Sequence, residues 1–125
     1  MGAGKSKSVL IVEDEPVIAE ALVYLLQREG LEVAVRGDGE AALEVLHSEP
    51  PDLMILDIML PGISGMEVLE TVRRDNALRS LPVLMLTAKG QRKDRSAAEE
   101  AGASLFITKP FSNAELVGHV KDLLA

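Results

Sequence analysis

The sequence predicts an α/β domain in which a parallel sheet is covered by helices on both of its faces. Short apolar runs alternate along the chain with longer stretches whose apolar residues recur at helical spacing. The runs are continuously apolar rather than alternating with polar residues, which is typical of parallel strands that helices cover on both sides. Five strand–helix units in 125 residues fit a single three-layer domain.

Strands and helices are expected to follow one another strictly along the chain. Runs such as Leu53-Met54-Ile55-Leu56 mark the strands. Pro16 suits the first turn of a helix, and Gly30 suits the end of the same helix. The expected strands are 9–12, 31–35, 53–56, 83–86 and 105–107, and the expected helices are 16–29, 40–47, 65–74, 91–101 and 112–124.

Composition excludes several kinds of site. The chain has no cysteine, so it can contain no disulfide, thiolate zinc site or cysteine nucleophile. Its 13 basic and 20 acidic side chains give a net charge of −7, which argues against direct nucleic-acid binding because such binding needs a basic face. Aromatic residues make up only 2% of the chain, so base stacking on single strands is not expected either.

The chain is expected to hold one domain and a short tail. Residues 1–7 are small and polar, lack the apolar stretch of a signal peptide, and are expected to form a flexible tail before the domain at 8–125. No apolar run approaches the roughly 20 residues that span a bilayer. We therefore expect a domain that works in the cytoplasm and does not contact a membrane.

Charged and hydroxyl side chains follow four of the expected strands at their carboxyl ends. Ligands of open parallel sheets bind beyond this edge, so the side chains are expected to gather where a ligand would lie. Any one of them alone is more simply a surface charge or a strand-end cap, but the complete set favours a site. The residues are Glu13, Asp14, Asp57, Thr87 and Lys109.

The types of residue in this set indicate phosphoryl chemistry. Three carboxylates at one edge would repel one another unless a cation lay among them, and Mg²⁺ typically takes one or two carboxylates together with waters and a phosphate oxygen. A carboxylate in such a site can attack a phosphoryl group and form an aspartyl phosphate. The Lys109 ammonium and the Thr87 hydroxyl could contact the phosphoryl oxygens.

Four stretches of the sequence carry a resemblance to a known family. They are VLIVEDEP, PDLMILDIMLPGISGMEVL, PVLMLTAK and ITKPF, and they occur in this order from Ser8 onwards. With them the chain closely resembles the receiver domain of two-component response regulators. The resemblance implies a flavodoxin-like, doubly wound sheet with strand order 2-1-3-4-5 and five helices on its two faces.

The resemblance also implies a role for each residue at the sheet edge. Asp57 would accept the phosphoryl group. Mg²⁺ would be the cofactor, bound by Asp14 and Asp57 directly, by Glu13 through water and by the Met59 carbonyl. Lys109 would contact the phosphoryl group.

Two further residues would form the switch. Thr87 would turn its hydroxyl inward on phosphorylation, and the ring of Phe106 would follow. Pro110 matches the position at which the family has a cis peptide, so the resemblance implies that the bond between Lys109 and Pro110 is cis, a form that only bonds preceding proline adopt at low cost.

By the same resemblance the domain is a signalling switch rather than an enzyme with an external substrate. A sensor histidine kinase or a histidine phosphotransfer protein would supply phosphohistidine, and the domain would catalyse its own phosphorylation and dephosphorylation. It would signal to an output domain or an effector protein through the surface of the fourth helix, fifth strand and fifth helix.

Two other classes of function fit these residues less well. A phosphatase or phosphotransferase acting on small molecules also uses an aspartate nucleophile and Mg²⁺, but it usually needs a second carboxylate two residues later, where this chain has Met59. An interaction module that is never phosphorylated would not need the complete set of site residues.

Several positions depart from the common pattern of the family. Ser64 stands where an aspartate is frequent, although serine can still cap the following helix. Ser104 and Leu105 stand where regulators with a winged-helix output often carry two aspartates, and the last helix lacks the arginines of that class's dimer face. We expect little effect from Ser64, whereas the differences at Ser104, Leu105 and the last helix argue against that dimer and that output.

Overall fold

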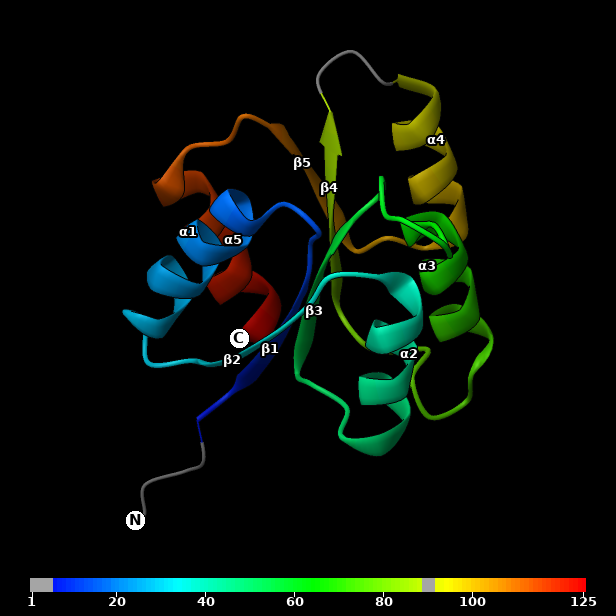
Figure 1. Cartoon of the computed structure of the whole chain (residues 1–125), viewed down its shortest axis with the longest axis horizontal. Coiled ribbons are helices and arrows are strands. Elements are labelled where there is room, and N and C mark those ends of the chain that lie inside the picture. Colours follow the sequence, from blue (N-terminus) through cyan, green and yellow to red (C-terminus); the bar gives the residue numbers. More distant parts are fainter. Residues whose placement is uncertain (1–5, 89–91) are drawn as a thin grey trace.

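A computed structural model describes residues 6–88 and 92–125. Within them strands and helices alternate along the chain (Figure 1). Most of the expected tail and the expected first residue of the fourth helix, 91, lie outside the described residues. The strands are β1 (Ser8–Val12), β2 (Glu32–Arg36), β3 (Leu53–Asp57), β4 (Val83–Ala88) and β5 (Leu105–Lys109). The helices are α1 (Pro16–Gln27), α2 (Gly39–Ser48), α3 (Gly65–Arg74), α4 (Arg92–Ala101) and α5 (Asn113–Leu124).

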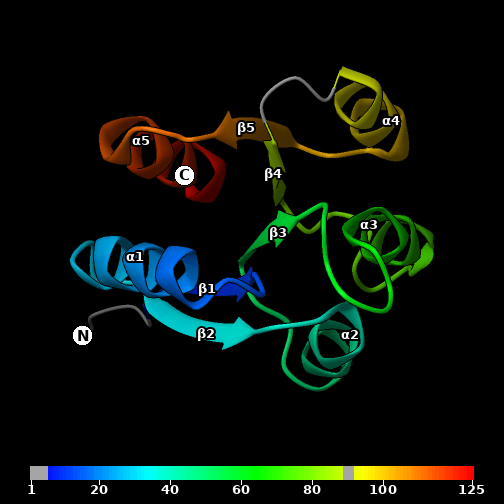
Figure 2. The same cartoon turned by 45° about the horizontal axis from the view of Figure 1, so that its top comes forward.

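The strands form a parallel sheet with the order β2-β1-β3-β4-β5. Helices α1 and α5 lie on one face of the sheet, and α2, α3 and α4 lie on the other (Figure 2). The predicted three-layer, doubly wound fold is therefore confirmed. Of the helices in the described part of the chain, none is long and apolar enough to cross a membrane.

The central strand β3 contributes to two separate apolar clusters, because successive side chains of a strand point to opposite faces. Leu53 and Ile55 pack on the side of α1 and α5, whereas Met54 and Leu56 pack on the side of α2 and α3. All four side chains are fully buried. Burial on both faces explains why this run is continuously apolar, and each side chain contributes about 1.5–3 kcal/mol.

Strand β2 does not fit the expectation that every strand is buried on both faces. It lies at the edge of the sheet and pairs with β1. Glu32 and Arg36 are exposed, whereas Val33 and Val35 contact the α1 and α5 cluster. Because only one face of β2 is well covered, exposed and half-buried residues alternate along it.

Side chains at the amino ends fix where several helices begin. Asp38, Ser64 and Ser112 accept hydrogen bonds from backbone N–H groups in the helix that follows, at 2.8, 3.2 and 3.0 Å. Ser64 thus caps α3, as the sequence predicts. Pro16 opens α1, and Gly30, with a φ of 81°, lies in the turn between α1 and β2.

One arginine joins several segments at the amino-terminal edge of the sheet. The Arg73 guanidinium donates hydrogen bonds to the carbonyl oxygens of Leu81 (2.7 Å), Gly102 (2.8 Å) and Arg79 (3.1 Å) and to the Ser104 hydroxyl (3.4 Å). Burial lowers the pKa of this guanidinium. Arg73 therefore ties the end of α3 to the segments that precede β4 and β5.

Arg73→Met is expected to lower the free energy of unfolding by about 2–4 kcal/mol, because several backbone carbonyls lose a charged donor while methionine keeps an apolar stem. Urea denaturation followed by circular dichroism measures the change. Arg74→Met, at an exposed position of the same helix, is the control and should change stability by less than about 0.5 kcal/mol. Equal losses in the two variants would contradict this account.

Candidate functional site

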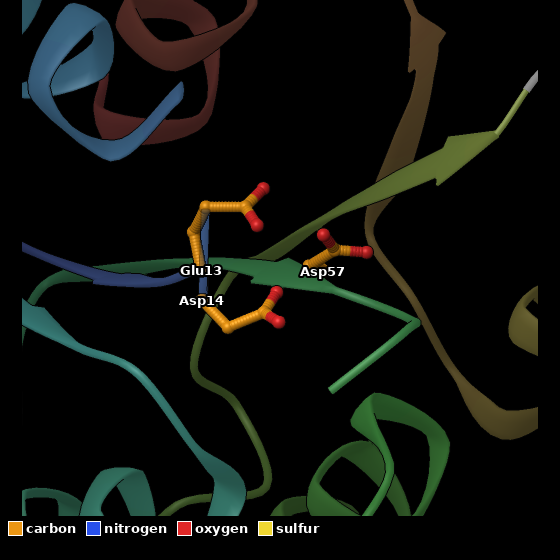
Figure 3. A group of neighbouring side chains, drawn as sticks. All are labelled: Glu13, Asp14 and Asp57. Carbon is orange, nitrogen blue, oxygen red and sulfur yellow. The ribbon is translucent and has the colours of Figure 1, made fainter. Parts of the chain in front are cut away.

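Three carboxylates meet at the carboxyl ends of β1 and β3 (Figure 3). Ligand oxygens of Glu13, Asp14 and Asp57 all lie within 4.8 Å of one another. Glu13 and Asp57 are 2% and 4% exposed, whereas Asp14 is exposed. The pairing of β1 with β3 places the ends of these strands side by side, so acids far apart in the sequence form one cluster.

The Lys109 ammonium lies between the two buried carboxylates. Its Nζ is 2.6 Å from Asp57 Oδ2 and 3.0 Å from Glu13 Oε1. Burial by itself would lower the pKa of Lys109, but hydrogen bonds and charge from Asp57 and Glu13 outweigh burial and raise it. The lysine therefore stays charged and offsets part of the negative charge at the sheet edge.

Lys109 does not offset all of this charge. The pKa of Glu13 is raised to about 7, mainly by burial and further by Asp57, although Lys109 and the backbone N–H of Glu15 act in the opposite direction. Three carboxylates lie beside one ammonium at this edge, so a further cation would stabilise their charged forms. The carboxylate oxygens of Glu13, Asp14 and Asp57 suit a hard divalent ion such as Mg²⁺.

The loop after β3 orients the Asp57 side chain. The backbone N–H of Met59 donates a hydrogen bond to Asp57 Oδ1 at 2.9 Å, while Lys109 donates to Oδ2. Each carboxylate oxygen thus has its own donor, which holds the group in one orientation. The Met59 side chain is 62% exposed, so the loop presents it to solvent.

The remaining expected residues lie on or just after β4 and β5. Thr87 is buried, and its hydroxyl donates to the Ile107 carbonyl oxygen at 3.5 Å, which is a long and weak hydrogen bond. Phe106 is half-buried and packs against the cluster on the side of α2, α3 and α4. The peptide bond between Lys109 and Pro110 is cis.

The structure adds one residue that the sequence pattern does not single out. Gly65, the first residue of α3, lies against the backbone of Asp57 and Ile58. The sequence does indicate that Gly65 begins a helix, because it directly follows the capping residue Ser64. The contact itself depends on how α3 packs on the sheet, which local sequence does not specify.

Comparison with known proteins identifies the family. The family model of the response regulator receiver domain matches residues 9–121. The chain therefore belongs to the receiver domains of two-component response regulators. Its acidic cluster fits the phospho-acceptor aspartate and magnesium site of that family.

Individual relatives show the same likeness. The chain is 40% identical to the phosphate regulon transcriptional regulatory protein PhoB of Escherichia coli over 119 residues, which cover 95% of the chain and 52% of PhoB. It thus spans about half the length of this relative.

Solved structures of receiver domains match the whole fold. One from a histidine kinase of Syntrophus aciditrophicus is 35% identical, with a TM-score of 0.90 over 95% of this chain and 90% of that one. The receiver domain of the sensor histidine kinase PA1611 from Pseudomonas aeruginosa is 28% identical, with a TM-score of 0.88 over 96% of this chain and 98% of that one. In that structure a magnesium ion is coordinated in the active site cleft.

Proposed function

We propose that Asp57 accepts a phosphoryl group from phosphohistidine on a sensor histidine kinase or a histidine phosphotransfer protein. The observation that carries this proposal is the placement of the Asp57 carboxylate. It is buried, it is oriented by the Met59 N–H and the Lys109 ammonium, and it lies beside two further acids. A carboxylate held in this way can act as a nucleophile towards phosphorus.

In the proposed transfer, an oxygen of Asp57 attacks phosphorus in line with the nitrogen of the phosphohistidine. The oxygen–phosphorus bond forms while the phosphorus–nitrogen bond breaks, and the imidazole leaves with the electron pair and takes up a proton. Glu13, Asp14, Asp57 and the Met59 carbonyl would hold Mg²⁺, which supplies positive charge to the phosphoryl oxygens. Hydrolysis of the acyl phosphate then restores the free carboxylate of Asp57.

Lys109 acts before and after the transfer in this proposal. Without a phosphoryl group its ammonium bridges Asp57 and Glu13. Once Asp57 carries the group, the same ammonium can contact a phosphoryl oxygen, because the group is attached to the carboxylate that Lys109 already touches. The lysine thus offsets negative charge in both states.

Thr87 and Phe106 are the proposed switch residues. The Thr87 hydroxyl can exchange its weak bond to Ile107 for a bond to a charged phosphoryl oxygen. Its movement would leave space beside β4 for the Phe106 ring, and the surface of α4, β5 and α5 would change shape. An output domain or an effector protein in the cytoplasm would bind that surface.

Phosphoramidate, a small donor with a phosphorus–nitrogen bond, tests the proposal. In the presence of Mg²⁺ the chain is expected to gain a single phosphoryl group, and it should gain none when EDTA removes the ion. Intact-mass spectrometry detects the adduct, and hydroxylamine should remove it because it cleaves acyl phosphates. An adduct that forms equally in EDTA, or that resists hydroxylamine, would overturn the proposed aspartyl phosphate.

Binding of Mg²⁺ is tested in a separate experiment. The chain contains no tryptophan, so intrinsic tryptophan fluorescence cannot report Mg²⁺ binding. Calorimetry and NMR titration can report it. Mg²⁺ is expected to shift the amide signals of Asp14, Asp57 and Met59. A titration that leaves these signals in place would rule out the proposed ligands.

A further inference from the structure

Gly65 contacts the backbone of the proposed phospho-acceptor. A Cβ on Gly65 would overlap the Asp57 carbonyl oxygen, and it would lie 2.8 Å from Ile58 Cα and 2.9 Å from the Asp57 carbonyl carbon. These neighbours are backbone atoms, so they cannot turn aside as the end of a flexible side chain can. Gly65 is not among the glycines with a positive φ, so the close contact rather than the backbone conformation is what requires glycine here.

Hydrogen bonds connect this contact to the site. The Gly65 N–H donates to the Ile58 carbonyl oxygen at 3.0 Å, and the Ile58 N–H donates to the Leu86 carbonyl oxygen at 3.2 Å. The next N–H, that of Met59, orients the Asp57 carboxylate. The loop between β3 and α3 is therefore closed at Gly65, directly beside the N–H that the proposed acceptor needs.

A second glycine lies on the far side of the same loop. A Cβ on Gly39 of α2 would lie 2.6 Å from the Ile63 carbonyl oxygen and 3.0 Å from Val68 Cγ2. The side chains of Leu60 and Ile63 pack against the apolar cluster on this face of the sheet. The loop is thus packed between two helices, and close packing leaves it little room to shift.

We propose that Gly65 is a positioning residue for phosphoryl transfer. Its missing side chain lets the first turn of α3 hold Asp57 and Met59 where they can serve the phosphoryl group and the ion. The inference rests on the proposed function and adds to it a residue that touches neither the phosphoryl group nor the ion. A side chain at Gly65 would displace the Ile58 and Met59 backbone and withdraw the N–H from Asp57 Oδ1.

Gly65→Ala is expected to weaken Mg²⁺ binding about 10- to 100-fold and to slow labelling by phosphoramidate by a similar factor. Gly102→Ala is the matched control. Gly102 has a φ of 100°, and a Cβ there would lie 3.1 Å from Arg73 Nε, so alanine strains the fold away from the site. This control should lose stability but keep the Mg²⁺ affinity and labelling rate of the wild-type chain.

The Met59 amide separates positioning from a general loss of stability. In Gly65→Ala, without added ion, its NMR signal should move upfield and its hydrogen exchange should speed up, because the bond to Asp57 weakens. In Gly102→Ala the same signal should keep its position. If Gly65→Ala does not fold, Gly39→Ala replaces it in the test, since its methyl group pushes the same loop at Ile63.

The inference is overturned if Gly65→Ala, or Gly39→Ala in its place, binds Mg²⁺ and is labelled as well as Gly102→Ala. It is supported if only the variants beside the loop lose affinity and the Met59 signal moves with them. A wild-type chain that binds no Mg²⁺ and takes up no phosphoryl group would overturn the proposed function itself. These results are distinguishable because the wild-type chain is measured first.

Discussion

Asp57→Asn is expected to abolish phosphorylation, so that intact-mass spectrometry finds no phosphoryl group under conditions in which the wild-type chain gains one. An amide is a poor nucleophile, so the bond to phosphorus does not form. The substitution also removes one of the three carboxylate charges of the cluster, which should weaken Mg²⁺ binding. Both effects act on the same step, and we expect the loss to be complete.

The control for this variant is Asp122→Asn, an identical change at an exposed position of α5, which should be phosphorylated like the wild-type chain. NMR titration of Glu13 provides a second check. Asp57 helps to raise the pKa of Glu13 to about 7, so the pKa should fall in Asp57→Asn although burial still raises it. An adduct of equal size on Asp57→Asn would mean that another residue is the acceptor.

Thr87→Ala is expected to separate phosphorylation from the change of shape. In the wild-type chain, beryllofluoride, which stands in for the phosphoryl group, should shift the NMR signals of Asp57, Phe106 and α4 together. In Thr87→Ala the shift at Asp57 should remain, whereas the shifts at Phe106 and α4 should be largely lost. The reason is that alanine has no hydroxyl with which to follow the new negative charge.

Thr108→Ala is the matched control, because Thr108 lies directly across from Thr87 in the pairing of β4 with β5. It should keep the full response at Phe106. If the shifts at Phe106 persist in full in Thr87→Ala, the signal reaches the α4, β5 and α5 surface by another route, and the proposed switch is wrong.

The positions of the elements could be predicted from sequence because local patterns determine them. Both faces of β3 are buried, so its residues form a continuous apolar run that is visible in the sequence. Ser64 and Ser112 cap the helices that follow them. The membership of the acidic cluster could be predicted for a related reason, since the ends of parallel strands lie at one edge of the sheet.

Strand β2 shows where local patterns fall short. Its strand character was expected, but its exposure depends on its place at the edge of the sheet, which topology decides. Ser104 and Leu105, which stand where regulators with a winged-helix output often carry two aspartates, also illustrate the limit. Sequence shows that the aspartates are missing, whereas only the structure shows that the Ser104 hydroxyl accepts hydrogen bonds from Val83 N–H and from Arg73.

The sequence by itself determined the fold class, the order of the elements and which residue types meet at the carboxyl edge of the sheet. The tertiary structure decided how these residues interact: Lys109 joins Glu13, 96 positions away, and Asp57, 52 positions away. It also decided the raised pKa of Glu13 and the contact of Gly65 with Asp57. Burial, charge coupling and close contact depend on separations of a few ångströms between distant segments, and these separations exist only after the segments have packed together.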